Sequence, residues 1–253
     1  MCLKLFGNNV DGIVRKLEAL ENLLVSELPA VLFFQETKTG RPGRIKTPST
    51  NKYTFYELHR TINSEKGAQG GGLAIGVLNV LDPSWISEGD DDAEILTVEI
   101  WVEGFPIRLI CGYGPQESDS KYRKDKFWEY INTEVANSKK DGASTIIQMD
   151  GNLRAGNQII SNDTKPRNQN GNRFEDFLLT NPNYLTVVNA TNLCEGVFTR
   201  VRNLSKNIID FYVVCDQILT LVTKMKVDEN GEYQISRYKG RVVHTDHNML
   251  YLE

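Results

Sequence analysis

The sequence predicts one α/β domain, a layered sandwich in which two β-sheets pack face to face with helices on the outside. Along all 253 residues, apolar runs of strand length alternate with amphipathic segments of helical spacing. Several strand segments alternate apolar and polar residues, which is typical of antiparallel or mixed sheets with one covered face. No linker, repeat or low-complexity stretch interrupts the pattern, so we expect residues 1–253 to form a single domain.

The elements follow from hydrophobic periodicity in chain order. Ile13, Leu17, Leu20 and Leu24 have helical spacing, so the first helix is expected over 13–25. The other expected helices are 120–136 and a short one at 173–179. The expected strands are 4–6, 30–34, 53–56, 73–77, 95–102, 107–113, 144–149, 185–188, 208–214, 220–227 and 248–252. Segments 30–34 and 144–149 are almost wholly apolar, as strands buried on both faces are.

Composition is that of an ordinary globular protein, with 40% apolar and 25% charged residues. No stretch approaches the roughly 18 apolar residues of a membrane helix, and the N-terminus is too short and polar for a signal peptide. Four scattered cysteines without a CxxC pair argue against a disulfide scaffold and a zinc site. We therefore expect an intracellular protein that does not contact a membrane.

The net charge of −4, taken alone, argues against nucleic-acid binding, which usually needs a basic surface. The charge is segregated, however. Residues 80–104 carry eight acidic residues and no Lys or Arg, so the rest of the chain sums to +4. Residues 38–66 sum to +5, and 121–126 and 199–206 to +3 each. Each basic segment alone is compatible with a solvated surface, but together they favour a shared anion-binding face if the fold joins them.

Polar side chains occur where several predicted strands end or begin. They are Asn9, Glu36, Tyr113, Asp150, Asn152, Asp210, Asp246 and His247. Taken singly, a carboxylate after a strand is more often a turn former or a helix cap than a functional group. Asp210 lies among apolar strand residues, where a charge is costly without a partner, and His247 is the candidate partner. Since strand ends hold side chains rigidly, the whole set predicts a site.

The set offers three kinds of chemistry. Glu36, Asp246 and Asn9 supply the oxygen ligands that Mg²⁺ prefers. Asp150 with the neighbouring amide of Asn152 could orient a water molecule and hold an oxyanion, and a histidine with an acidic partner could transfer protons or stabilise negative charge. Together they suit metal-assisted hydrolysis of a phosphodiester. The glycines at 70–72 fit neither nucleotide-binding pattern, GxxxxGK[ST] or GxGxxG.

Eight short motifs occur in a fixed order over nearly the whole chain. They are Asn9-Val10-Asp11-Gly12-Ile13, Gln35-Glu36-Thr37, Gly70-Gly71-Gly72-Leu73-Ala74-Ile75, Gly112-Tyr113-Gly114-Pro115, Asp150-Gly151-Asn152, Asn170-Gly171-Asn172-Arg173-Phe174, Ile209-Asp210-Phe211 and Thr245-Asp246-His247-Asn248. In this order the chain resembles the endonuclease/exonuclease/phosphatase superfamily, and most closely the endonuclease domain of LINE-type (non-LTR) retrotransposons. The resemblance implies a DNase I-like fold, a four-layered α/β sandwich of two mixed sheets.

The resemblance also implies a metal site. Glu36 would bind the divalent ion, Mg²⁺ or alternatively Mn²⁺, with Asn9 and Asp246 close to it. Thr199 and Thr245 stand where the family has hydroxyl residues that line the site.

The remaining roles that the resemblance implies concern the scissile phosphate. Tyr113 would contact that phosphate, and Asp150 would orient or deprotonate the attacking water. Asn152 would donate a hydrogen bond to the phosphate in the transition state. His247, held by Asp210, would face the same phosphate oxygens.

Departures from the family pattern do not remove a catalytic group. Asn8 replaces an aromatic residue, Met149-Asp150-Gly151-Asn152 replaces Gly-Asp-Phe-Asn, and Thr245 replaces a serine. The altered stretch Ser205-Lys206-Asn207 puts the preference for a DNA sequence in doubt. The basic residues expected to contact DNA are Lys38, Arg41, Arg44, Arg200, Arg202 and Lys206.

Three hypotheses remain open from the sequence. The first is a Mg²⁺-dependent endonuclease that nicks duplex DNA to prime reverse transcription, monomeric, and nuclear if from a eukaryotic retrotransposon. It would be linked to reverse transcriptase in a polyprotein, or free-standing. The second is another phosphodiesterase of the superfamily, such as an abasic-site repair nuclease. The third is a catalytically silent binding module, against which the complete catalytic set argues.

Overall fold

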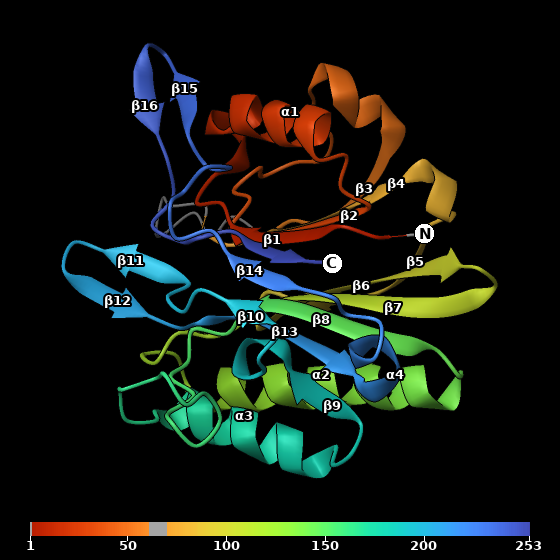
Figure 1. Ribbon diagram of the computed structural model, residues 1–253, viewed down its shortest axis with the longest axis vertical. Helices are drawn as coiled ribbons and strands as arrows, with labels where there is room; N and C mark the ends of the chain where they lie inside the picture. Colours follow the sequence, from red (N-terminus) through yellow and green to blue (C-terminus); the bar gives the residue numbers. More distant parts are fainter. Residues whose placement is uncertain (1, 61–69) are drawn as a thin grey trace.

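Residues 2–60 and 70–253, which the computed structural model describes, fold into four layers (Figure 1). Helix α1 (Leu17–Ser26) covers the outer face of a seven-stranded sheet. Helices α2 (Lys121–Lys140) and α3 (Gln169–Thr180) cover the outer face of a six-stranded sheet. The two sheets face each other, which confirms the four-layered α/β sandwich expected from the sequence.

The seven-stranded sheet is mixed. Its order is β10 (Cys194–Glu195), β14 (Met225–Val227), β17 (Leu250–Leu252), β1 (Leu5–Asn9), β2 (Val31–Gln35), β4 (Leu73–Leu78) and β3 (Tyr53–Leu58). Strands β1 and β2 are parallel and are joined through α1, so both end at the same edge of the sheet. Strands β17 and β4 flank this pair in antiparallel orientation.

The six-stranded sheet repeats this arrangement. Its order is β5 (Ser84–Asp90), β6 (Ala93–Val102), β7 (Phe105–Tyr113), β8 (Ser144–Asp150), β13 (Asp210–Cys215) and β9 (Leu185–Val187). Strands β7 and β8 are parallel and are joined through α2. In this register Tyr113 and Asp210 lie on either side of Asp150, so three of the predicted site residues are neighbours in one sheet.

Three apolar clusters hold the layers together. The cluster between the sheets includes Phe33 of β2 and Tyr212 of β13, whose rings meet edge to face at 6.1 Å. Phe34, the next residue, points instead into the cluster beneath α1. Because successive strand residues face opposite sides, a strand covered on both faces is apolar at every position. A third cluster, with Trp128 and Phe174, joins α2 and α3 to the six-stranded sheet.

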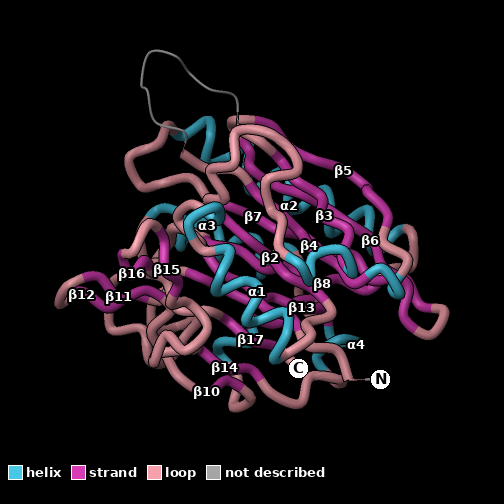
Figure 2. The backbone as a smooth tube through the Cα atoms, turned by 90° about the horizontal axis from the view of Figure 1, so that it is seen from above, coloured by secondary structure: helices cyan, strands magenta, loops and turns pink. Residues whose placement is uncertain are grey.

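Short elements occupy the connections. They are the 3₁₀ turns η1 (Ile13–Arg15), η2 (Pro48–Lys52), η3 (Asn79–Leu81) and η4 (Val188–Ala190), the helix α4 (Asp216–Leu219), and the strands β11 (Arg200–Arg202), β12 (Ser205–Asn207), β15 (Ser236–Tyr238) and β16 (Arg241–Val243). Strands β11 and β12 form one hairpin, and β15 and β16 form another. Figures 1 and 2 show both hairpins at the same end of the molecule. No helix in the described ranges is long and apolar enough to cross a membrane.

Every strand expected from the sequence is present, and the differences have local causes. The first helix starts at Leu17 rather than Ile13, because Ile13–Arg15 form the separate 3₁₀ turn η1 and Lys16, with φ of −120° and ψ of 18°, departs from the helical conformation. The strand expected at 220–227 is reduced to Met225–Val227, because the preceding residues form α4 and its last turn. Strands β5, β10, β11, β12, β15 and β16 were not predicted, since they are short or polar.

Candidate active site

The predicted site residues meet at the edge where the two parallel strand pairs end. Asn9 closes β1, Glu36 follows β2, and Asp150 closes β8 in the opposite sheet. The side-chain amide Nδ2 of Asn9 donates to Glu36 Oε1 at 3.0 Å and to Asp150 Oδ2 at 2.8 Å. One amide therefore bridges carboxylates from both sheets, and the Oδ1 of Asn9 is fixed by the backbone amide of Asp11 at 3.1 Å.

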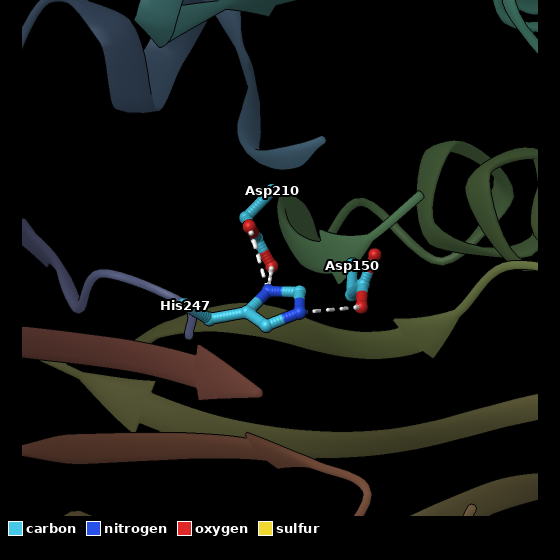
Figure 3. A group of neighbouring side chains, drawn as sticks. All are labelled: Asp150, Asp210 and His247. Atoms are coloured by element: carbon cyan, nitrogen blue, oxygen red, sulfur yellow. Dashed lines mark hydrogen bonds and ion pairs between the residues drawn. The ribbon is translucent and has the colours of Figure 1, made fainter. Parts of the chain in front are cut away.

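His247 lies between two aspartates (Figure 3). Its Nδ1 is 3.0 Å and 3.1 Å from the carboxylate oxygens of Asp210, and its Nε2 is 3.9 Å from Asp150 Oδ2. All three side chains are buried. The pairing of Asp210 with His247, predicted from the sequence as the partner of a charge on an apolar strand, is present in the structure.

The environment shifts the pKa values of this group. Burial lowers the pKa of His247, but the charges of Asp210 and Asp150 outweigh burial and raise the pKa to about 9. Burial, followed by the charge of Asp210, raises the pKa of Asp150 to about 7, against the opposing effects of His247 and Asn9. At neutral pH His247 is therefore an imidazolium whose Nε2–H is directed towards Asp150, a carboxylate with some proton affinity.

Glu36 is held by three donors. Tyr113 Oη donates to Glu36 Oε1 at 2.7 Å, Asn9 donates to the same oxygen, and Lys38 Nζ is 2.7 Å from Oε2. Burial raises the pKa of Glu36, but these hydrogen bonds and the charge of Lys38 lower it more, so the net shift is downward. Glu36 and Lys38 both have φ of 50°, a left-handed conformation that non-glycine residues rarely adopt and that clusters at functional sites.

Lys38 also pairs with Asp11 in the turn after β1. The sequence predicts that Lys38 contacts DNA, whereas the structure turns its ammonium group inward onto Glu36 and Asp11. Only the position of Lys38, two residues after Glu36, hints at this pairing in the sequence, and such a spacing is common in polar loops.

Asp246 lies near the same ring nitrogen of His247 as Asp150 does. Its Oδ1 is 3.8 Å from His247 Nε2, and its Oδ2 accepts a hydrogen bond from Arg200 Nε at 2.9 Å. The backbone amide of Val201 donates to the Asp246 carbonyl at 2.8 Å, which fixes β11 to the loop that carries His247. Arg200 is therefore neutralised at the edge of the site.

The two predicted hydroxyl residues hold the backbone of the site. Thr199 Oγ1 accepts hydrogen bonds from the amides of Ile209 and Asp210 at 2.9 and 3.0 Å. Thr245 Oγ1 donates to the Asn9 carbonyl at 2.8 Å and accepts from the His247 amide at 3.2 Å. Both side chains are buried, and each fixes the segment that carries a functional group.

Asn152 lies beside Asp150 with φ of 46°. Its amide nitrogen donates to Asp150 Oδ1 at 3.0 Å, and its side-chain Nδ2 donates to the Gly114 carbonyl at 2.8 Å. Asn170, at the start of α3, is fully buried and donates to the Pro115 carbonyl at 2.5 Å. Its side chain also approaches the Asn152 carbonyl at 3.5 Å, so it holds the loop that follows Tyr113 against the loop of Asn152. No residue is assigned this role from the sequence alone.

The donors suit a hard divalent cation. Ligand-type atoms of Asp150, Asp210 and His247 lie within 4.8 Å of one another, but the imidazolium form of His247 has no nitrogen free for a metal, so the carboxylates are the donors. The carboxylates of Glu36 and Asp246 adjoin this group through Asn9 and His247. Carboxylate oxygens with room for retained water are what Mg²⁺ and Mn²⁺ prefer. The group of Asp150, Asp210 and His247 differs from the predicted ligands Glu36, Asn9 and Asp246, whose role as ligands stays a prediction.

The basic segments are divided by the fold. Arg41, Arg44, Arg202 and Lys206 are exposed and have no ion pair among the described residues, and Lys206 Nζ lies 5.1 Å from the ring of Phe198. The expectation that segment 121–126 joins an anion-binding face is wrong, because three of its cations pair with acidic groups. These pairs are Lys121–Asp125, Arg123–Asp119, Arg123–Asp92, Lys126–Asp90 and Lys126–Asp92. The predicted basic residue Lys66 lies outside the described residues.

Comparisons with known proteins give a structural likeness. No protein-family model matches the sequence, and no curated protein matches it significantly. Among solved structures, the chain is similar to a 3'-5' exonuclease (NExo) from Neisseria meningitidis, with a TM-score of 0.73, 17% identity and coverage of 99% of each chain. An AP endonuclease from Archaeoglobus fulgidus has a TM-score of 0.72 at 17% identity, covering 100% of this chain and 99% of that chain.

A third similar structure is the endonuclease domain of TRAS1, a telomere-specific non-LTR retrotransposon, with a TM-score of 0.65 and 16% identity. The match covers 100% of this chain and 98% of that chain. At such identities a likeness establishes the fold alone. Because two mixed sheets packed between helical layers align over essentially the whole chain with these nucleases, the protein has the DNase I-like α/β fold.

Proposed function

We propose that this protein is a divalent-metal-dependent phosphodiesterase of the endonuclease/exonuclease/phosphatase superfamily that nicks duplex DNA. The observation that carries the proposal is the buried group in which His247 lies between Asp210 and Asp150, beside Glu36 and Asn9. Burying three ionisable groups together is costly for the fold, and such clusters are typical of catalytic sites.

The residues divide the reaction between them. Asp150, with a raised pKa, accepts a proton from the attacking water, and its position is fixed by Asn9 and by the amide of Asn152. His247, protonated and held by Asp210, stabilises the negative charge on the phosphate oxygens. A bound Mg²⁺ or Mn²⁺, held by Glu36 and the neighbouring carboxylates, would polarise the phosphate and stabilise the leaving oxygen.

Two specific activities remain candidates for this site. The motif order favours the endonuclease domain of a non-LTR retrotransposon, acting on duplex DNA within a polyprotein that also carries reverse transcriptase. AP endonucleases share the fold, with TM-scores of 0.72 and 0.73, so cleavage at abasic sites is the second candidate activity. Both use one phosphodiesterase centre, so substrate preference separates them.

The test is cleavage of supercoiled plasmid by purified protein with Mg²⁺ or Mn²⁺, with and without EDTA, followed by mapping of the cut sites. A parallel assay compares a duplex containing one abasic site with the same duplex intact. We expect nicks that EDTA abolishes. A strong preference for the abasic duplex would select the repair activity, and no nicking with either metal would refute the nuclease.

Site variants show whether this centre is responsible. His247→Ala should lower the nicking rate by a factor on the order of 10²–10⁴, the range for positioned acid–base and electrostatic groups. The control is Glu129→Ala on the exposed face of α2, which has no ion pair among the described residues. Contaminating nuclease would give equal nicking by the parent and by His247→Ala.

A further inference from the structure

The β15–β16 hairpin carries positive charge that the proposed active site does not use. Residues 233–245 contain Arg237, Lys239 and Arg241 and no acidic residue. All three are exposed, and none forms an ion pair among the described residues. Two cations at the site are paired instead, Lys38 with Glu36 and Arg200 with Asp246. Three uncompensated cations in five residues make this tip a concentrated positive charge.

The start of β15 is attached to α1 by hydrogen bonds, which fix the base of the hairpin. Ser236 is buried, and its Oγ accepts from the amide of Ala19 at 3.4 Å, while the Arg237 amide donates to Glu18 Oε2 at 2.6 Å. Both contacts are to the first turn of α1. The loop residues Lys239 and Gly240 have φ of 51° and 74°, as a tight two-residue hairpin turn requires. The base is therefore anchored to the domain, and the tip projects from it (Figure 1).

Strand alternation decides which side chains face outward. Ser236 faces α1, so its neighbour Arg237 and the cross-strand partner Val242 occupy the opposite, outer face. Val242 is 61% exposed. Lys239 lies at the turn itself, 5.5 Å above the ring of Tyr238. The outer face with Arg237 and the turn with Lys239 are thus free to meet a ligand, and Arg241, which pairs with Tyr238 on the opposite face, is also exposed.

The hairpin lies next to the candidate active site in sequence and in space. Strand β16 ends at Val243, and only His244 separates it from the segment Thr245–His247. Figure 1 shows β15–β16 and β11–β12 at the end of the molecule where β1 ends, with β15–β16 beside α1 and β11–β12 away from it. A long polyanion lying across the site would meet one hairpin on each side.

We propose that the β15–β16 hairpin is a second DNA-binding arm, which contacts the phosphate backbone of duplex DNA away from the scissile phosphate. The inference rests on the proposed function for the identity of the polyanion. Exposed Arg and Lys side chains bind backbone phosphates without reading sequence, and a two-stranded ribbon has a width that DNA grooves admit. The arm lengthens the bound duplex and adds positive charge in a chain whose net charge is −4.

The test measures DNA binding in buffer with EDTA, so that cleavage plays no part. Fluorescence anisotropy gives the dissociation constant over a range of salt concentrations for a duplex of about three helical turns and for one of about one turn, roughly 10 bp. The variant is Arg237→Gln/Lys239→Gln/Arg241→Gln. On the long duplex we expect weaker binding, and a salt slope that is flatter by about 0.9 for each phosphate that is no longer neutralised. On the short duplex the change should be much smaller.

Two further variants keep the result interpretable. Lys52→Gln/Lys140→Gln removes exposed, unpaired cations just before β3 and β8, at the far ends of those strands from the site, and should leave the slope as in the parent. Val242→Lys adds a cation to the outer face and should steepen the slope and tighten binding of the long duplex. The unfolding midpoint of each variant shows that the fold is retained.

The outcomes separate this inference from the proposed function. An unchanged slope in the folded triple variant would overturn the arm even if the parent nicks plasmid. Equal losses on short and long duplexes would also overturn it, because the hairpin would then lie at the scissile phosphate. Binding that depends on the hairpin in a parent that does not nick would support the arm and refute the nuclease.

Discussion

The imidazole Nδ1 of His247 lies 3.0 and 3.1 Å from the two carboxylate oxygens of Asp210, and both side chains are buried. A buried imidazole without a partner would lose its proton easily. The charge of Asp210 reverses this, and the pKa of His247 is raised to about 9 although burial alone lowers it. The charge state of His247 at neutral pH therefore depends on the aspartate behind it.

This dependence predicts a change in the pH profile. The imidazolium is present below pH 9 and is lost as pH rises through the pKa of His247, about 9, so His247 sets the alkaline limit of activity, while protonation of Asp150, whose pKa is about 7, sets the acid limit. In Asp210→Asn the opposing charge is gone while burial remains, so the alkaline limit should move to lower pH and the maximal rate should fall. The measurement is nicking rate against pH for both proteins, with Glu129→Gln as the control. An alkaline limit that stays in place would mean that another group sets it.

We expect the buried charge of Asp150 to lower the stability of the fold. Its pKa is raised from 3.8 to about 7, so the folded state favours the protonated carboxyl. The stability that this protonation contributes is lost as pH rises from 3.8 through about 7. Asp150→Asn removes the charge and keeps the shape. Above pH 7 and without metal, the free energy of unfolding of the variant should exceed that of the parent by at least about 1 kcal/mol, since one pKa unit corresponds to about 1.4 kcal/mol. Urea denaturation at several pH values measures it, and lower stability of the variant at every pH would contradict the raised pKa.

Gly7 and Gln148 predict a paired effect on stability beneath the site. A Cβ atom on Gly7 would collide with Cδ and Cγ of Gln148, so the glycine leaves room for a glutamine of the opposite sheet. Gln148 Oε1 accepts from Gln35 Nε2 at 2.5 Å between the sheets. Gly7→Ala should destabilise the fold by about 1–3 kcal/mol, the usual cost of overpacking. Adding Gln148→Ala should recover part of that loss in urea denaturation, and additive losses would show that the two side chains do not collide.

Much of this site can be predicted from the sequence, because the sequence pattern indicates where the strands end. An apolar run followed by Gln35-Glu36, and another followed by Asp150, mark where buried strands reach solvent. Parallel strands joined by a helix end at the same edge of their sheet, which places Asn9 near Glu36 in one sheet and Tyr113 beside Asp150 in the other. The packing of the two sheets then brings these pairs together. The pairing of Asp210 with His247 could be predicted because a charge on an apolar strand needs a partner.

Contacts between loops are not visible in the sequence. Lys38 bends back onto Glu36 through two residues of positive φ, and nothing in their types requires that conformation. Arg200 and Asp246 are 46 residues apart in the chain, yet they pair because β11 bonds to the segment before His247. The β15–β16 hairpin is too short and too polar to show a strand period.

Lys38 predicts an effect on metal affinity. Its ammonium lies 2.7 Å from Glu36 Oε2, on the carboxylate that is expected to bind the metal, so a divalent cation must approach a fixed positive charge. Lys38→Met should therefore lower the dissociation constant for Mn²⁺, measured by calorimetry on the protein without DNA. The control Lys140→Met removes an exposed charge at the end of α2 and should bind Mn²⁺ as the parent does. Weaker Mn²⁺ binding in Lys38→Met would mean that the lysine positions the carboxylate rather than competing for it.

The β11–β12 hairpin predicts unequal contributions from its three cations. Arg202 and Lys206 are exposed and have no ion pair among the described residues, whereas Arg200 is bound to Asp246. Arg202→Gln and Lys206→Gln should each flatten the salt dependence of DNA binding by about 0.9, the value for one phosphate that is no longer neutralised. Arg200→Gln should change that slope much less, but should slow nicking because it releases the Asp246 carboxylate beside His247. Anisotropy in EDTA and nicking with Mg²⁺ give the two readouts, and an equal slope change for all three would show that Arg200 leaves Asp246 to bind DNA.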